Sequence, residues 1–95
     1  MRYMIVEHFR DGDPRPVYAR FRERGRLMPG GVHYVDSWVS DDLTRCYQLM
    51  ECDDRTLLDA WMAAWSDLVM FEVHPVITSA EARARVPGTA DGTPE

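Results

Sequence analysis

Runs of alternating apolar and polar residues, separated by turn residues, predict four β-strands. The first run, Arg2–Phe9, is rich in β-prone side chains and ends at a turn made of Asp, Gly and Pro. The others cover about Val32–Val39, about Arg45–Cys52, and Val69–Ile77. Because only Ser40-Asp41-Asp42 makes the tight connection between the second and third runs, we expect these two to form an antiparallel hairpin.

Two further segments carry apolar residues on one side, which predicts amphipathic helices. Asp13 before Pro14 is typical of a helix N-cap followed by proline at the first helical position, and Pro29-Gly30-Gly31 ends this segment. Asp53 or Asp54 caps the second helix. The apolar positions of the first helix are Val17, Tyr18, Phe21 and Leu27-Met28. Those of the second recur at three- and four-residue steps at Leu57, Leu58, Trp61, Met62, Trp65 and Leu68.

The resulting order, β-α-β-β-α-β, predicts an α+β, ferredoxin-like fold: an antiparallel four-stranded sheet with both helices on one face. We expect a single domain over residues 1–86, since a chain of 95 residues leaves no room for a second. Thr78-Ser79-Ala80-Glu81 predicts a short capped helical turn. From Pro87 on, Gly, Thr, Pro and acidic residues predict a disordered tail over residues 87–95.

Strand alternation divides the residues of the sheet into two sets. One set is nearly all apolar, and we expect it to lie beneath the helices: Met4, Val6, Val35, Val39, Tyr47, Leu49, Phe71, Val73 and Ile77. The other set mixes aromatic and polar side chains: Tyr3, Ile5, Glu7, Tyr34, Asp36, Trp38, Cys46, Gln48, Met50, Glu72 and His74. Such a mixture is typical of a partly covered small-molecule pocket.

A second copy of the chain is the simplest cover for this mixed set. Two sheets packed face to face form a dimeric α/β barrel, which removes an exposed apolar patch and encloses a cavity. A domain of this size buries only roughly 60–65% of its unfolded surface, which also favours a homodimer. The alternative is a monomer whose open face carries scattered aromatic residues.

Charge and hydropathy argue against two classes of partner. The chain has 11 Lys and Arg against 16 Asp and Glu, a net charge of −5, which argues against nucleic-acid binding. No apolar run approaches the roughly 20 residues of a membrane span, so we expect no membrane partner. The N-terminal segment reaches Glu7 and His8 too early for a signal peptide, and we therefore expect a cytoplasmic protein.

The two cysteines, Cys46 and Cys52, are expected to be packing thiols. Six residues of extended strand place them about 20 Å apart, whereas a disulfide needs Cα atoms within about 7 Å. They also lack metal-ligand spacing, because the nearest histidines, His33 and His74, are far away in the sequence. We expect no metal site.

Several segments together resemble a family of small bacterial proteins catalogued as domain of unknown function 3303, over about residues 2 to 85. These segments are Tyr3-Met4-Ile5-Val6-Glu7, Tyr34-Val35-Asp36-Ser37-Trp38, Cys46-Tyr47-Gln48-Leu49-Met50-Glu51, Trp65-Ser66-Asp67-Leu68 and Phe71-Glu72-Val73-His74-Pro75-Val76. The resemblance implies a member of the dimeric α/β-barrel superfamily. That superfamily includes cofactor-free monooxygenases, cyclases, isomerases, dehydratases, haem enzymes and pure ligand binders, so the resemblance implies no particular activity.

Glu7 and Asp36 are the candidate acid/base residues, because burial raises the pKa of a carboxyl group toward neutrality. In the predicted sheet they flank the strand of Gln48, so we expect all three side chains in one cavity, with Gln48 orienting a substrate oxygen. Alternatively, both carboxylates pair with arginines at the sheet rim, and Gln48 merely satisfies Asp36.

His74 is the third catalytic candidate, since a histidine facing a cavity can act as a base or bind haem iron; otherwise it is a satisfied polar group. We expect no cofactor, with haem left open. Tyr34 and Trp38 are candidates to stack on a flat ring, or else pack at the dimer interface. Met50 and Glu72 complete the set of substrate-binding candidates.

Trp61 and Trp65 are expected to be core residues of the second helix, but they would line a pocket that lay between helix and sheet. The arginines at positions 20, 22, 24 and 26 are expected to form a solvated face.

Three functions remain open. The first is a cofactor-independent enzyme acting on an aromatic or polyketide-like metabolite. The second is a non-catalytic binding protein for such a molecule, and the third is a structural dimerisation module.

Overall fold

One antiparallel sheet carries the fold in the computed structural model, which describes residues 1–88. Its strands are β1 (Arg2–Phe9), β2 (His33–Val39), β3 (Arg45–Glu51) and β4 (Val69–Val76), in the order β2-β3-β1-β4. Neighbouring strands all pair antiparallel. The predicted strands and their neighbours are confirmed, with each strand ending within one residue of its expected bounds.

In the described part of the chain three α-helices accompany the sheet: α1 (Arg15–Arg24), α2 (Arg55–Ala63) and α3 (Ser79–Arg85). A short 3-10 turn, η1 (Arg10–Gly12), joins β1 to α1. This order confirms the α+β class and is consistent with the ferredoxin-like arrangement. Of the tail predicted over residues 87–95, all but the first two residues lie outside the described part of the chain.

The helix ends follow from local hydrogen bonds. The Asp54 carboxylate accepts the backbone N–H of Thr56 at 2.9 Å, which confirms one of the two expected caps of α2. The Asp13 carboxylate accepts the N–H of Arg15 at 3.0 Å, but α1 starts one residue later than predicted, with Pro14 at the N-cap position. The expected extension of α2 to Leu68 is wrong, because turns follow the helix after Ala63.

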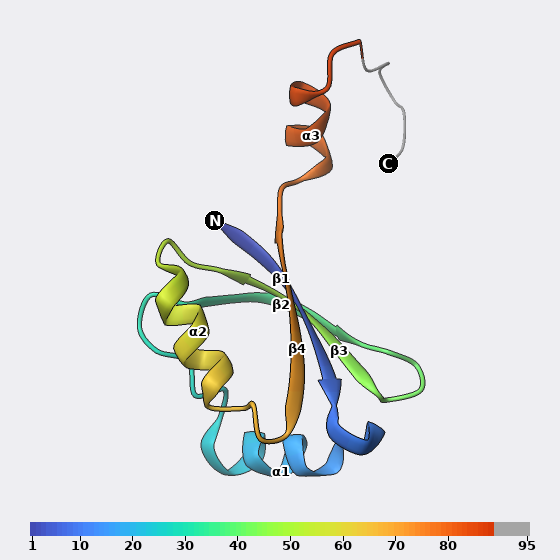
Figure 1. The fold of residues 1–95 in the computed structure, drawn as a ribbon, viewed down its shortest axis with the longest axis vertical. Helices are drawn as coiled ribbons and strands as arrows, with labels where there is room; N and C mark the ends of the chain where they lie inside the picture. Colours follow the sequence, from blue (N-terminus) through green and yellow to red (C-terminus); the bar gives the residue numbers. More distant parts are fainter. Residues whose placement is uncertain (89–95) are drawn as a thin grey trace.

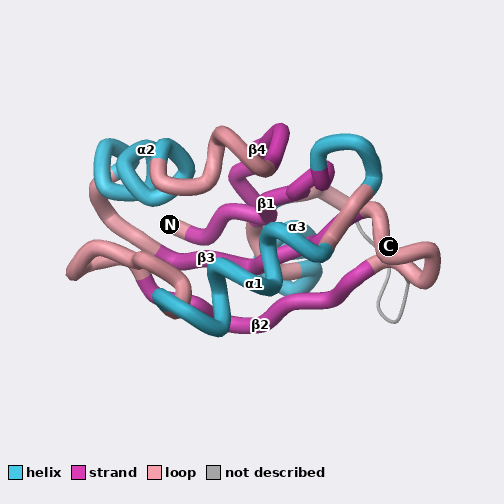
Figure 2. The backbone as a smooth tube through the Cα atoms, turned by 90° about the horizontal axis from the view of Figure 1, so that it is seen from below, coloured by secondary structure: helices cyan, strands magenta, loops and turns pink. Residues whose placement is uncertain are grey.

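Helices α1 and α2 both pack on one face of the sheet, which we call the covered face. Figure 1 shows α2 beside the strands and α1 across one end of them, and Figure 2 shows the strands in succession from β4 to β2. Side chains of both helices meet the strands there: Leu58 and Trp61 of α2 pack with Ile5, and Val17 of α1 packs with Phe9. Within residues 1–88 no helix covers the other face, which we call the open face.

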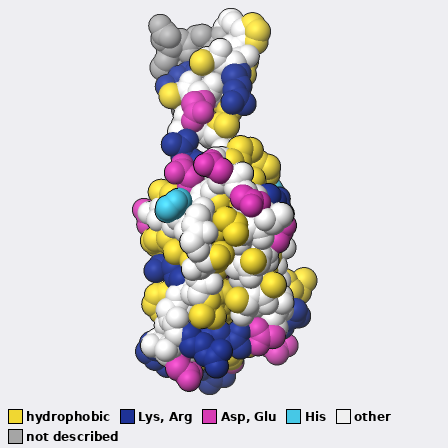
Figure 3. All heavy atoms as spheres, turned by 90° about the vertical axis from the view of Figure 1, so that its left-hand side faces the viewer, with side chains coloured by type: hydrophobic (Ala, Val, Ile, Leu, Met, Phe, Trp, Pro, Cys, Tyr) yellow, Lys and Arg dark blue, Asp and Glu magenta, His cyan; other side chains and the backbone are white. Residues whose placement is uncertain are grey.

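Helix α3 extends away from this body. It begins with a capping box between Thr78 and Glu81, as predicted, and it has no buried residue. An ion pair of 3.2 Å between Arg2 and Glu81 connects it to β1. Figure 3 shows α3 at one end of the molecule and a concentration of basic side chains at the opposite end, where α1 lies.

The strand register corrects the expected assignment of the two faces. Glu7 pairs with Cys46 and with Phe71, so these three side chains share the covered face. Tyr3, Ile5, Gln48 and Met50 also lie there, whereas the open face holds four residues that we expected beneath the helices: Met4, Val6, Tyr47 and Leu49. The expectation was right for Phe71 and Val73 of β4. It failed in β1 and β3 because Glu7 and Gln48 indicated an outer face, whereas the covered face contains a cavity that accommodates both.

A β-bulge in β2 explains the remaining misplacements. Tyr34 pairs with Met50 and Asp36 with Leu49, so Val35 is an extra residue between them. Tyr34 consequently lies on the covered face with Ser37, and their hydroxyl groups are hydrogen-bonded at 2.6 Å. Downstream of the bulge, Val39 lies on the covered face, as expected, whereas Asp36 and Trp38 lie on the open face. Two other residues expected beneath the helices are exposed: Val35 in the bulge and Ile77 beyond the end of β4.

Candidate functional site

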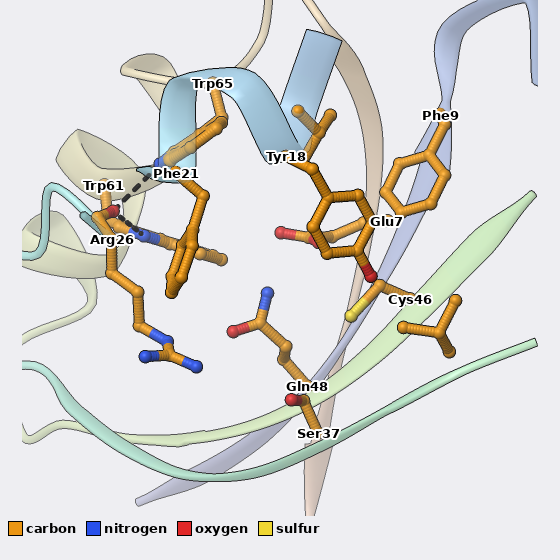
Figure 4. Close-up of a pocket in the computed structure, with 12 residues that line it drawn as sticks. Glu7, Phe9, Tyr18, Phe21, Arg26, Ser37, Cys46, Gln48, Trp61 and Trp65 are labelled. Carbon is orange, nitrogen blue, oxygen red and sulfur yellow. Dashed lines mark hydrogen bonds between the residues drawn. The ribbon is translucent and has the colours of Figure 1, made fainter. Parts of the chain in front are cut away.

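A cavity of about 260 Å³ lies between the covered face, α1 and the end of α2 (Figure 4). Its polar lining consists of Glu7, Tyr18, Arg26, Ser37, Cys46 and Gln48. Its apolar lining consists of Phe9, Val17, Phe21, Val39, Trp61 and Trp65. Aromatic walls with a few convergent polar groups are typical of small-molecule sites.

Glu7 is the acidic group of this cavity. Its side chain comes from β1 and only 5% of the residue is exposed. Burial raises the pKa of Glu7 to about 7, against the lowering effects of hydrogen bonds from Gln48 and Cys46 and of the Arg26 charge. At neutral pH the carboxyl group is therefore divided between its acid and base forms, which suits a group that transfers protons.

The thiol of Cys46 and the hydroxyl of Tyr18 are neutral hydrogen-bonding groups beside Glu7. Burial, followed by the Glu7 charge, raises the pKa of Cys46 to about 12. Burial likewise raises the pKa of Tyr18, with smaller contributions from Cys46 and Glu7. Since a thiol reacts as the thiolate, Cys46 is not activated as a nucleophile.

Arg26 is a cavity residue that sequence reasoning missed. It follows Gly25, whose positive φ of 70° ends α1, and its backbone oxygen accepts the indole N–H groups of Trp61 at 3.0 Å and Trp65 at 2.9 Å. Its guanidinium lies 3.7 Å from the centroid of the Tyr34 ring. The helix-ending glycine was the available signal, because it separates Arg26 from the helical arginines before it.

The two tryptophans both support the core and line the cavity. Trp61 is 2% exposed, and its ring lies 5.6 Å from that of Phe71. Trp65 lies in the turn after α2, and the Arg20 guanidinium lies over its ring, 5.5 Å from the ring centroid. We expected both residues to be core residues, and to line the pocket if it lay between helix and sheet. The cavity does lie there, and both residues line it.

The structure separates Glu7 from Asp36, which we expected in one cavity. Glu7 and Gln48 line the cavity, whereas Asp36 lies exposed on the open face, where its carboxylate accepts the backbone N–H of Ser37. The expected pair of neighbouring carboxylates is therefore wrong, because the bulge at Val35 reverses the alternation of β2.

The other candidates divide between the two faces as well. Met50 is fully buried in the core and Tyr34 is half-buried beneath Arg26. Trp38, 54% exposed, lies on the open face. Glu72 and His74 lie there too: Glu72 bonds Nε2 of His8 at 2.6 Å and Nε2 of His74 at 3.2 Å, and these bonds lower its pKa. None of these last three faces the cavity.

A comparison with protein-family models identifies the chain. Residues 1–90 match the model described as Domain of unknown function (DUF3303). The chain belongs to this family. No curated protein and no solved structure matched the sequence.

This DUF3303 chain offers no clustered metal ligands in residues 1–88: no group of three or more His, Cys, Asp and Glu side chains could hold an ion there. Cys46 and Cys52 are free thiols, as expected, and both are buried. No helix within the described residues is long and apolar enough to cross a membrane. Glu7, Gln48 and Arg26 supply the charged and amide side chains of the cavity lining.

Proposed function

We propose that this protein is a cofactor-independent enzyme that moves protons on an aromatic or polyketide-like metabolite bound in the covered-face cavity. The observation that carries the proposal is Glu7, a buried carboxyl group whose pKa of about 7 equips it as both acid and base at neutral pH. Isomerase- and cyclase-type reactions can begin when a base removes a proton from a carbon beside a carbonyl group.

In this proposal Glu7 is the proton carrier. Its carboxylate takes the proton from the substrate carbon, and the electron pair of the broken C–H bond moves to the neighbouring carbonyl oxygen. The amide N–H of Gln48 donates a hydrogen bond to that oxygen, and the positive charge of Arg26 stabilises it. Glu7 then returns the proton to another atom of the same substrate, which leaves the enzyme unchanged.

The dimensions and lining of the cavity support a ligand with a flat ring. A cavity of about 150 Å³ is sufficient to hold benzene, so about 260 Å³ accommodates a substituted or fused ring system. Trp61, Trp65 and Phe21 supply flat surfaces against which such a ring can stack.

Hydrogen–deuterium exchange tests this proposal without knowledge of the natural substrate. The probe is 2-tetralone, a bicyclic aromatic ketone with acidic hydrogens beside its carbonyl group, dissolved in D₂O and followed by proton NMR. We expect the protein to accelerate loss of these hydrogens, with a rate that rises with pH and levels off above about pH 7 as Glu7 becomes ionised.

Glu7→Gln should remove the acceleration, since the amide cannot accept the proton. The matched control is Glu72→Gln, which changes an exposed carboxylate on the open face and should retain the wild-type rate. Equal exchange by Glu7→Gln would contradict the role of Glu7. Shifts of the Trp61 and Trp65 indole signals without any exchange would indicate a non-catalytic binding protein instead.

We also propose that the protein is a homodimer in which the open faces of two copies pack together as a dimeric α/β barrel. Apolar side chains run across this face from β1 to β2: Met4, Val6, Leu49, Tyr47 and Trp38. Trp38 is 54% exposed, and none of the described helices covers this row. Pairing of the sheets would remove that apolar surface from water.

The free thiols Cys46 and Cys52 support a cytoplasmic location, since unpaired cysteines suit a reducing compartment.

A further inference from the structure

Arg26 brings a positive charge into the cavity, and hydrogen bonds to its backbone hold the residue in the cavity wall. Its backbone oxygen accepts two indole N–H groups, from Trp61 and Trp65, which fasten this loop residue to the end of α2. The side chain then extends into the cavity, as Figure 4 shows, with Gln48 beside it. The two indole hydrogen bonds fix the backbone of Arg26 at the wall of the cavity.

The surroundings of this guanidinium are aromatic. It lies 3.7 Å from the ring centroid of Tyr34 and 5.1 Å from that of Phe21. Among residues 1–88, no carboxylate lies within ion-pair distance of Arg26, and none of its guanidinium N–H groups has a hydrogen bond within the described chain. Arginine presents five donors in a planar fork that matches a carboxylate, so these donors remain available to a ligand.

Arg20, which lies near the same cavity, differs from Arg26 because its guanidinium has hydrogen-bond partners within the chain. It donates to both carboxylate oxygens of Asp67, at 2.7 and 2.6 Å, and to the backbone oxygen of Ala64. Both arginines contact aromatic rings, but only Arg20 has an anionic partner in the described chain. A half-buried cation without such a partner gains most from an anion supplied by the ligand.

We infer that the cavity takes planar aromatic carboxylates, and that Arg26 binds their carboxylate group while the ring lies against the aromatic walls. The inference rests on the proposed function in one respect: it uses the same cavity as the ligand site. Beyond the proposed function, the inference specifies that the ligand is an anion and that Arg26 selects for its charge.

The groups around Glu7 make the affinity for an anion dependent on pH. Cys46 and Gln48 of β3, Tyr18 of α1 and the Arg26 guanidinium face its carboxyl group. The pKa of Cys46 is raised to about 12 and that of Tyr18 is also raised, so Glu7 is the acidic group of this set that changes charge between pH 6 and 8. Ionised Glu7 repels an anionic ligand, so affinity falls as the pH rises through about 7.

Matched pairs of probes test the inference: 4-hydroxybenzoate with 4-hydroxybenzamide, and 2-naphthoate with 2-naphthamide. The members of each pair have the same ring and nearly the same size, but only the acid carries a charge. Binding to the full chain is measured at pH 6 from the NMR shifts of the indole N–H groups of Trp61 and Trp65. We expect each acid to bind at least tenfold more tightly than its amide.

Arg26→Gln should remove this tenfold preference and leave the affinity for the amides unchanged. Arg26→Lys should restore part of it, because the charge remains but the planar fork is lost. The matched control is Arg24→Gln, an exposed arginine two residues earlier that should keep the wild-type preference. Raising the pH from 6 to 8 should weaken acid binding several-fold in the wild type and leave it constant in Glu7→Gln.

The outcomes separate the two proposals. Acids and amides that bind equally well, or a preference that survives Arg26→Gln, would overturn the inference about charge while leaving the cavity as a ligand site. If no probe of either kind shifted the Trp61 and Trp65 signals, both the inference and the proposed ligand site would be wrong. A thermal melt of each variant checks that it is folded under the conditions of the titration.

Discussion

The two faces of the sheet are made from the same four strands, yet they differ in what their side chains contact. On the covered face, α1 and α2 enclose Glu7 and Gln48 in a cavity walled by Trp61 and Trp65. On the open face, Trp38 and Met70 are 54% and 60% exposed. Polar residues are therefore buried on one face while apolar residues are exposed on the other. The position of the helices, rather than the polarity of each set, decides which set is buried.

The largest effect separating the faces should come from their tryptophans. Trp61→Ala removes a fully buried indole that contacts Phe71 and hydrogen-bonds Arg26, and we expect it to lower the free energy of unfolding by about 3–5 kcal/mol. Trp38→Ala, on the open face, should lower it by less than about 1 kcal/mol. Urea melts at a low protein concentration measure both. Similar losses for the two variants would contradict the contrast between the faces.

The buried carboxyl group should make stability depend on pH. The folded-state pKa of Glu7 is about 7 and its ordinary value is 4.5, so the folded protein holds this proton more strongly than the unfolded chain. The free energy of unfolding should therefore fall as the pH rises from about 4.5 to 7, by roughly 3 kcal/mol, and then level off.

Glu7→Gln should lack this fall, because its amide does not titrate. Denaturant melts of both proteins from pH 4.5 to 8.5 measure the difference, with Glu72→Gln as the control for a carboxylate on the open face. A wild-type profile parallel to that of Glu7→Gln would show that Glu7 titrates normally.

A charge on the open face should affect association rather than folding. We expect Trp38→Glu to raise the dimer dissociation constant at least about 100-fold, since it would bury an unpaired carboxylate between two sheets. Sedimentation velocity at high micromolar concentration should show a dimer for the wild type and a monomer for the variant. The control is Leu43→Glu, because Leu43 is equally exposed but lies in the β2–β3 turn. A wild-type monomer would contradict the proposed assembly.

The smallest effect concerns how firmly α1 covers the cavity. This helix has no buried residue, and the Arg20–Asp67 ion pair ties it to the turn after α2. Arg20→Met should lower the free energy of unfolding by no more than about 1 kcal/mol, because the pair is partly exposed. Hydrogen exchange should nevertheless become faster in the amides of α1 and remain unchanged in β1. Arg22→Met, which changes an exposed arginine of the same helix, is the control.

The order of the elements was predictable because each boundary has a local cause in the sequence. Asp54 caps α2, Thr78 and Glu81 form the box that starts α3, and the short β2–β3 connection fixes a hairpin. The division of each strand into alternating sets was also correct in β1, β3 and β4, since it depends only on the two-residue period of a strand.

The side on which each set lies was not predictable in the same way. Both sets of β1 and β3 contain enough apolar residues to pack beneath a helix, and a pocket around Glu7 and Gln48 is compatible with either face of the sheet. The bulge at Val35 contains no glycine or proline that would indicate it in the sequence. Strict alternation therefore predicts Tyr34 and Asp36 on the same face of the sheet. The place of Arg26 in the cavity was not predictable, because it depends on a loop that is held by two tryptophans distant in the sequence, Trp61 and Trp65.

The extra residue in β2 has a practical consequence for the comparison of family members. Upstream of Val35, the side chains that face the cavity or the core occupy even-numbered positions such as Tyr34. Downstream they occupy odd-numbered positions, Ser37 and Val39. A gap moved by a single column in an alignment would therefore equate a buried position with a solvent-facing one. Aligning relatives on the pair Tyr34 and Ser37, whose hydroxyl groups touch, keeps equivalent side chains in the same column.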